Sequence, residues 1–282
     1  MASVEHGISV DHGISVDHGI AVEHRVVTAT PGPILFARYA FPPNHHGYCG
    51  PADNLAFFEN SAEGADNGEL RAMAREFAGA WPYLELIAGA TGLTDPLDRR
   101  AVEAYWIGSP RLDQIGMTPI GDSMQDRFRF RSGPRFSNLT EGVLAGGVPH
   151  HSFAVFCIYP WVGLLGDDRR SEQALTVLDM CRIRWGRVVS IDGDQVIVES
   201  AHLRWDGHRL DFAVPTVETV VRSIDGVGLA STLEPGDWVS MHWEWVCDRL
   251  TDHQVAALRH YTQRHLNIVN DAGQAGPAMM LG

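Results

Sequence analysis

Cysteine and histidine side chains that could bind a metal ion stand at two distant places in the chain. Cys181 is followed by Arg182 and Arg184, whose positive charges would favour the thiolate form of the cysteine. His242 belongs to a predicted strand over residues 238–246, and a period of two places it on the more polar strand face. Thiolate and imidazole together are suitable donors for low-spin iron. The alternative for such a pair is a buried thiol and a solvated imidazole, neither with a function.

A second group of possible ligands lies nearer the start of the chain. His45, His46 and Cys49 are close in sequence, and a Gly-Pro pair after Cys49 predicts a short helix whose N-terminus would lower the pKa of the thiol. His150 and His151, much later in the chain, could complete a metal site with them. Cys-Gly-Pro before a helix, with a histidine about 100 residues later, also resembles the order of papain-like cysteine hydrolases. In that alternative Cys49 is the nucleophile and His150 or His151 the base.

The first residues contain a six-residue repeat in which an acidic residue precedes each histidine. Its histidines are His6, His12, His18 and His24. Imidazole and carboxylate at every sixth position could hold nickel, zinc or copper loosely, since neutral imidazole is a ligand that suits all three metals. A period of six residues is, however, neither a helical period nor a closed chelate, which favours the other interpretation, a variable low-complexity tail. Residues 1–30 are therefore predicted to be a flexible tail outside the fold.

Helical patterns dominate the segment that would position Cys49 and the His150-His151 pair. Residues 31–178 are predicted to form one mostly helical domain, because apolar residues repeat at helical spacing over residues 70–81 and a helix start signal stands at residues 94–96. Arg and Phe alternate over residues 127–131, which is typical of an amphipathic strand or of an anion- or partner-docking face. The apolar run at residues 152–165 predicts a buried strand or core segment.

Strand and turn patterns dominate the segment that would position Cys181 and His242. Asp-Gly pairs at residues 192–193, 206–207 and 225–226 predict tight turns between short strands. Thr251 and Gln254 fit a capping box at the start of a last helix that runs to about residue 267. We therefore expect an α+β protein in which residues 179–270 form a small OB-like β-barrel with a C-terminal helix, followed by a flexible tail at 271–282.

Several short motifs of the barrel segment follow one another in a recognisable order. They are Met180-Cys181, Gly186-Arg187-Val188, Asp192-Gly193 and Gly236-Asp237-Trp238-Val239, followed by His242 and the last helix. In this order they resemble the HypC-type hydrogenase assembly chaperones. The resemblance implies that Cys181 and His242 hold iron with cyanide and carbonyl ligands during [NiFe]-hydrogenase assembly. Residues 31–51 also resemble a domain of uncharacterised actinobacterial proteins associated with [NiFe]-hydrogenase gene clusters.

Composition excludes several other functions. The 282 residues carry a formal net charge of −13, and no long basic tract is present, which argues against general nucleic-acid binding. The longest apolar run without charges, residues 152–166, is too short to span a bilayer, so no membrane partner is predicted and a cytoplasmic location is expected. Four scattered cysteines without a CxxC pair are expected to be reduced thiols.

The sequence thus favours an accessory protein for [NiFe]-hydrogenase maturation that is not itself a catalyst. It would carry an iron-cyanide-carbonyl fragment, or act as a chaperone for the large-subunit precursor, and its partners would be that precursor and the scaffold that assembles the fragment. Nickel or zinc could bind the histidine-containing tail. A papain-like cysteine hydrolase and a purely structural adaptor of a hydrogenase complex are the two alternatives.

Overall fold

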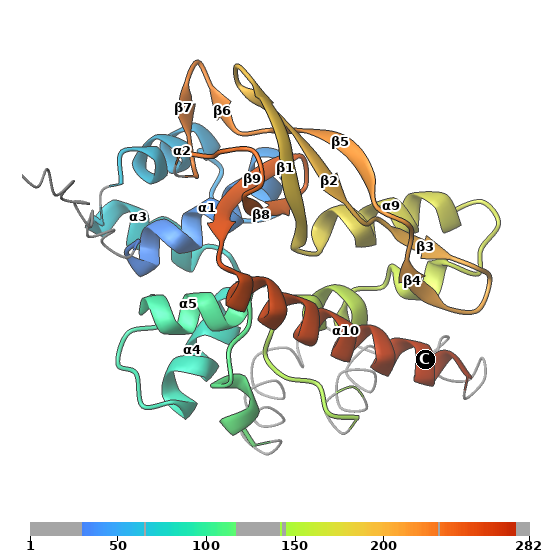
Figure 1. Cartoon of the computed structure of the whole chain (residues 1–282). Helices are drawn as coiled ribbons and strands as arrows, with labels where there is room; N and C mark the ends of the chain where they lie inside the picture. Colours follow the sequence, from blue (N-terminus) through green and yellow to red (C-terminus); the bar gives the residue numbers. More distant parts are fainter. Residues whose placement is uncertain (1–29, 65, 117–141, 143–144, 231, 275–282) are drawn as a thin grey trace, which may run out of the picture.

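The structure is a computed structural model, which describes residues 30–64, 66–116, 142, 145–230 and 232–274. It has an α+β fold, as the sequence predicts: helices form the first part of the chain, strands follow, and the long helix α10 (Asp252–Gln274) closes it (Figure 1). The histidine-containing tail and the Arg-Phe alternation at residues 127–131 lie outside the described residues. Within the described part, no helix combines the length and the apolarity that crossing a bilayer requires.

The helices of the N-terminal half begin where the sequence supplies side chains that cap them. Asp53, Asn67 and Asp98 each accept a hydrogen bond from a backbone N–H in the first turn of the following helix. The helical repeat predicted over residues 70–81 is divided between two of these helices. The helices are α1 (Gly32–His45), α2 (Asn54–Ala62), α3 (Gly68–Arg75), α4 (Trp81–Ala90), α5 (Arg99–Trp106) and the short 3-10 turn η1 (Leu112–Gln114).

Of the two alternatives predicted for the apolar run at residues 152–165, the core segment is confirmed for its buried first half, and the strand is wrong. The run forms α8 (His151–Phe153), the π-helical turn η3 (Ala154–Ile158) and the 3-10 turn η4 (Val162–Leu164), and α9 (Ser171–Cys181) follows. An apolar run does not by itself distinguish a buried strand from a buried helix. The His150 side chain accepts the backbone N–H of Ser152, which favours the helical start at this point.

Five strands pair in a closed order, β1-β2-β5-β9-β8, and form a barrel. Neighbours are antiparallel except β5 and β9, which are parallel and meet at Val221 and Trp245. Two further hairpins, β3-β4 and β6-β7, project from the barrel (Figure 1). The strands are β1 (Arg184–Asp192), β2 (Gln195–Ser200), β3 (Leu203–Trp205), β4 (Leu210–Phe212), β5 (Thr216–Val221), β6 (Ser223–Ile224), β7 (Val227–Gly228), β8 (Trp238–His242) and β9 (Trp245–Leu250).

Most predicted turns are present, but one predicted strand is a hairpin. The three Asp-Gly pairs lie between β1 and β2, β3 and β4, and β6 and β7, and the capping box of Thr251 and Gln254 starts α10. Residues 238–246, predicted as one strand, instead turn at Trp243 and Glu244 between β8 and β9. Trp243 has a φ of 53°, in the left-handed region that non-glycine residues seldom adopt. No glycine or asparagine marks this turn, so the sequence gives no signal of it.

Strand β8 has one face inside the barrel and one face against helix α1. Val239 and Met241 belong to the apolar interior of the barrel. Ser240 and His242 point the other way, and both are fully or almost fully buried, at 0% and 1% exposed. The Ser240 hydroxyl lies 2.7 Å from the Tyr39 hydroxyl of α1. The more polar strand face therefore carries polar side chains that are buried and paired with a helix rather than hydrated.

Two buried arginines link the barrel to the end of α9. Arg182 donates two hydrogen bonds to Asp179, at 3.0 and 2.8 Å. Arg184 is 0% exposed, donates to both carboxylate oxygens of Glu218 at 2.6 Å, and also donates to the carbonyl of Trp243. The Arg184–Glu218 pair therefore supports the β8–β9 turn from inside the protein.

We predict that Glu218→Ala lowers the free energy of unfolding by about 3–5 kcal/mol, because it leaves the Arg184 guanidinium buried without its counter-ion. Arg204→Ala is the control, since the Arg204–Asp211 pair has both side chains about 60% exposed and a 3.4 Å separation. It should cost at most about 1 kcal/mol. Urea unfolding followed by circular dichroism measures both, and equal costs would contradict the structural role of the buried pair.

Candidate metal centre

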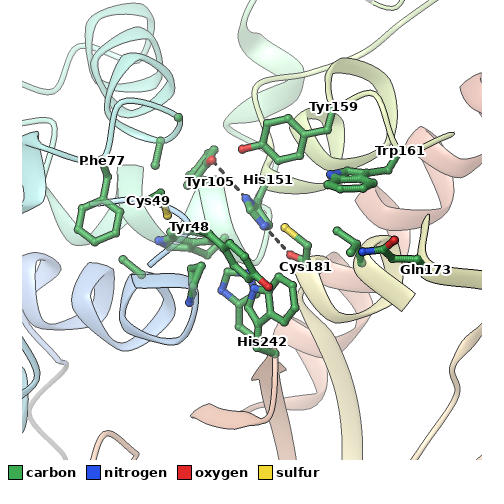
Figure 2. A pocket seen from close by; sticks show the side chains of 17 residues that line it. Tyr48, Cys49, Phe77, Tyr105, His151, Tyr159, Trp161, Gln173, Cys181 and His242 are labelled. Carbon is green, nitrogen blue, oxygen red and sulfur yellow. Dashed lines mark hydrogen bonds between the residues drawn. The ribbon is translucent and has the colours of Figure 1, made fainter. Parts of the chain in front are cut away.

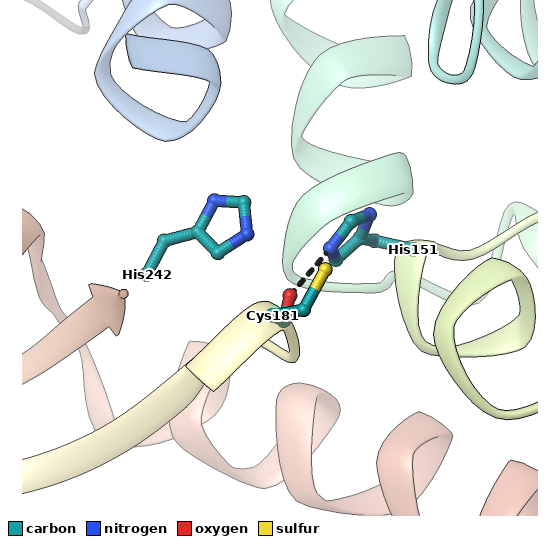
Figure 3. Close-up of side chains that lie close together, drawn as sticks. All are labelled: His151, Cys181 and His242. Atoms are coloured by element: carbon teal, nitrogen blue, oxygen red, sulfur yellow. Dashed lines mark hydrogen bonds between the residues drawn. The ribbon is translucent and has the colours of Figure 1, made fainter. Parts of the chain in front are cut away.

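Three possible metal ligands from three separate elements meet at one point. His151 is the first residue of α8, Cys181 the last residue of α9, and His242 the last residue of β8. One ligand atom of each lies within 4.8 Å of the other two (Figure 3). The structure thus brings together the two predicted ligands, Cys181 and His242, and adds a histidine from the helical half of the chain.

Backbone hydrogen bonds hold these elements together. The N–H of Trp243 donates to the carbonyl of Met180 at 2.8 Å, which ties the β8–β9 turn to the end of α9. His242 precedes Trp243 and Cys181 follows Met180, so this hydrogen bond brings His242 and Cys181 side by side. The Nε2 of His151 lies 2.8 Å from the Cys181 carbonyl and fixes the third element to the same point.

The imidazole of His242 is oriented as a metal ligand would be. Its Nδ1 lies 2.6 Å from the backbone carbonyl of Tyr39, and because a carbonyl only accepts, Nδ1 carries the hydrogen. In the neutral ring Nε2 then has a free lone pair. This atom is buried and has no hydrogen-bond partner among the described residues. A histidine that donates one N–H to a backbone carbonyl while the other nitrogen is free is the usual arrangement of a metal-binding imidazole.

The hydrogen bonds of His151 place its proton on Nε2, because the Cys181 carbonyl can only accept. Its Nε2 donates to the Cys181 carbonyl, and its Nδ1 lies 3.3 Å from the Tyr105 hydroxyl. A tyrosine hydroxyl can donate or accept. His151 can therefore shift its proton to Nδ1 and donate it to Tyr105, which would free Nε2 for a metal ion at the cost of the bond to Cys181.

All three side chains are held in their neutral forms. Burial lowers the pKa of His151 to about 4, and burial together with the neighbouring His151 lowers the pKa of His242 well below 6.5. Burial of the Cys181 thiol, with a smaller effect of Cys49, raises its pKa to about 12. A metal ion would therefore meet two neutral imidazoles and displace the proton of the thiol, so binding would release a proton.

The prediction that Arg182 and Arg184 favour the Cys181 thiolate is wrong. Both guanidinium groups are paired with carboxylates elsewhere, Arg182 with Asp179 and Arg184 with Glu218. A charge that is neutralised by its own counter-ion stabilises a nearby thiolate little, and the loss of hydration on burial then decides the pKa of the thiol.

The cluster forms part of a pocket with a volume of about 390 Å³ (Figure 2). Aromatic side chains dominate its wall, and none of the described residues that line it is Asp, Glu, Lys or Arg. The wall includes Tyr48, Cys49, Phe77, Tyr105, Trp106 and Trp243, together with the three members of the cluster. An uncharged wall of this kind favours apolar or neutral ligands next to the possible metal ions.

Cys49 lines the same pocket, but the predicted helix N-terminus is not at Cys49. Helix α2 begins at Asn54 after its cap Asp53, so the thiol has no helix dipole beside it. Although Cys49 is exposed, the protein atoms packed around its thiol reduce the hydration of the thiolate and raise the pKa to about 11. His45 and His46 are exposed, and His46 lies 2.7 Å from Glu244. None of these three residues belongs to the cluster of mutually close ligand atoms.

The His150-His151 pair is divided between two environments. His150 is 1% exposed, and its Nδ1 lies 2.7 Å from the Ser152 hydroxyl, which in turn lies 2.7 Å from the Nδ1 of His265 in α10. A base for Cys49 would have to be His150, which is held in this network, or His151, whose two nitrogens contact Tyr105 and Cys181. The arrangement therefore offers less to a cysteine nucleophile than to a metal ion.

The site and fold define a class of protein: an α+β chain with a buried His–Cys–His cluster between a helical layer and a small barrel. The chain belongs to DUF6390, a family of unknown function whose match covers residues 28–275. No curated protein and no solved structure matches the sequence.

Four buried neutral histidines should make the protein sensitive to acid. They are His150, His151, His242 and His265, whose pKa values all lie below 6.5 because of burial. The unfolded chain takes up protons at these residues near pH 6.5 and the folded chain does not, so unfolding is favoured as the pH falls. We predict that the free energy of unfolding falls by about 2 kcal/mol for each of these histidines when the pH is lowered from 7 to 5.

Urea unfolding at several pH values measures this loss. His242→Gln should remove about a quarter of the pH-dependent part, since glutamine does not titrate. A wild-type stability that is constant from pH 7 to pH 5 would show that the four imidazoles are not buried in their neutral forms.

Proposed function

We propose that the protein binds a transition-metal fragment through His151, Cys181 and His242 and transfers it to a partner. The observation that carries this proposal is the buried, unpartnered Nε2 of His242, whose lone pair faces a thiol and a second imidazole. A buried polar atom without a partner is costly, and a metal ion would satisfy it. Two imidazoles and one thiolate suit borderline and soft metals such as iron(II), nickel, copper and zinc.

We propose iron with cyanide and carbonyl ligands as the cargo and [NiFe]-hydrogenase maturation as the process. This assignment rests on the resemblance of residues 180–242 to HypC-type chaperones, in which the counterparts of Cys181 and His242 hold that fragment. Two observations support it: these two residues lie within 4.8 Å of each other, and the five barrel strands close in the way that an OB-like barrel requires.

The surroundings of the cluster suit a fragment with uncharged surfaces. The donors are neutral before binding, the pocket wall has no charged side chain among its described residues, and the volume of about 390 Å³ leaves space beside a metal ion for further small ligands. The cargo would leave the site by exchanging the protein's ligands for those of the recipient. We propose the large-subunit precursor as that recipient and the scaffold that assembles the fragment as the donor.

Infrared spectroscopy with metal analysis tests this proposal. For protein isolated without oxygen from its own host, we expect about one iron per chain together with cyanide and carbonyl bands. Cys181→Ala and His242→Ala should each lose most of the bound iron and the bands, because each removes one of the three ligands of the cluster. Cys157→Ala is the control, since Cys157 is a thiol outside the pocket lining.

Iron-free wild-type protein, combined with normal hydrogenase maturation by both ligand variants, would overturn the carrier function. In that case a structural adaptor would explain the maturation data, because an adaptor does not need either ligand. Folding of the variants is checked by their unfolding midpoints, so that lost iron is not confused with lost structure.

A further inference from the structure

Two thiols stand at different depths of one pocket. Cys49 is exposed, whereas Cys181 is less exposed and lies between the buried His151 and His242. Both line the same cavity, and in the view of Figure 2 the His151 ring lies between their sulfurs. In the proposed function Cys181, the deeper thiol, is a ligand, whereas Cys49, the outer thiol, has no role.

The other residues of the pocket provide few ligands for a metal ion that moves towards the cluster. Among the described lining residues, the only carboxylate-, imidazole- or thiol-bearing side chains are Cys49 and the three members of the cluster. Tyr48 and Trp243, whose ring centroids are 4.8 Å apart, form part of the aromatic wall. A hydrated ion that enters an apolar pocket loses water without gaining a donor, which is unfavourable. The Cys49 thiol would reduce the cost of this lost hydration, because it provides a ligand atom before the ion reaches the cluster.

The backbone at Cys49 is fixed in its outer position. The side-chain amide of Asn44, which is 2% exposed, donates 2.8 Å bonds to the carbonyls of both Cys49 and Pro51. Gly50 has a φ of 89°, and a Cβ at this glycine would lie 2.4 Å from the ring of Phe77. The loop thus packs closely where it is. Cys49 could join the cluster as a permanent fourth ligand only if this packing were broken.

We propose that Cys49 is a transit ligand, which binds the incoming metal ion at the mouth of the pocket and passes it to Cys181, His151 and His242. In the first step a metal–sulfur bond forms at Cys49, and the thiol proton leaves to water. In the second step the metal–Cys49 bond breaks and the Cys49 thiolate takes up a proton from water, and the ion then forms a bond to Cys181, whose thiol proton leaves to water. The sum is one ion bound and one proton released, with no oxidant or reductant. This inference rests on the proposed metal site.

Rapid mixing of anaerobic protein with cobalt(II) chloride tests the proposal, because thiolate-to-cobalt absorption reports the metal–sulfur bond. For Cys49→Ser we expect loading to be about tenfold slower, while the final absorbance and the dissociation constant stay within about twofold of the wild type. Cys49→His should restore fast loading, because imidazole is also a ligand for cobalt. Cys157→Ser, which changes a thiol outside the pocket lining, should load like the wild type.

The other outcomes separate this inference from the proposed function. Equal loading rates in wild type and Cys49→Ser would overturn the transit role and leave the metal site intact. A loss of thiolate absorbance at equilibrium in Cys49→Ser would also overturn it, by showing that Cys49 is a resident ligand. Failure of the wild type to bind cobalt at all would overturn the metal site itself, and binding that is unaffected by Cys181→Ala would do the same.

Discussion

The arrangement of the site depends on the main-chain N–H and C=O groups of Trp243. Its N–H donates to the Met180 carbonyl and its carbonyl accepts from Arg184, so that the turn between β8 and β9 is held from both sides. The residue has a φ of 53°, a conformation that costs a non-glycine residue roughly 1 kcal/mol or more. Backbone strain of this kind persists where surrounding bonds impose it, and here the bonds that impose it also bring His242 to Cys181.

A second constraint comes from the low polarity of the interior. Each charged group near the site is neutralised by its own partner, as with Arg182 and Asp179 or Arg184 and Glu218. The Cys181 thiol and the imidazoles of His151 and His242 have no such counter-ion, and burial holds them in their uncharged forms. The centre is therefore electrically neutral although it adjoins several ions. A cation that binds there must find its compensation in the ligands themselves, which favours metals that form strong bonds to sulfur and nitrogen over hard ions such as magnesium.

Local signals in the sequence predict much of the fold. Asp-Gly turns, the capping box of Thr251 and Gln254, and the helix caps act within a few residues, so they identify the barrel hairpins and most helix starts. The wrong predictions have different causes. The apolar pattern at 152–165 does not distinguish a strand from a helix, and the cap that His150 provides there is not visible in that pattern. The strand predicted through Trp243 breaks because Met180 and Arg184, some 60 residues earlier, hold the N–H and C=O of Trp243. The sequence pairs Cys181 with His242, but the Tyr39 carbonyl that orients His242 carries no side-chain signal at all.

The ligands' positions have a consequence for the timing of synthesis. The hydrogen bond that fixes the His242 ring joins residues 203 positions apart, and the cluster combines elements from both the helical and the barrel halves. A ribosome-bound chain that ends before β8 lacks His242, so the Tyr39 carbonyl has no imidazole to orient. The complete set of three donors is therefore absent from every translation product that ends before His242, and it becomes available only when β8 has been synthesised.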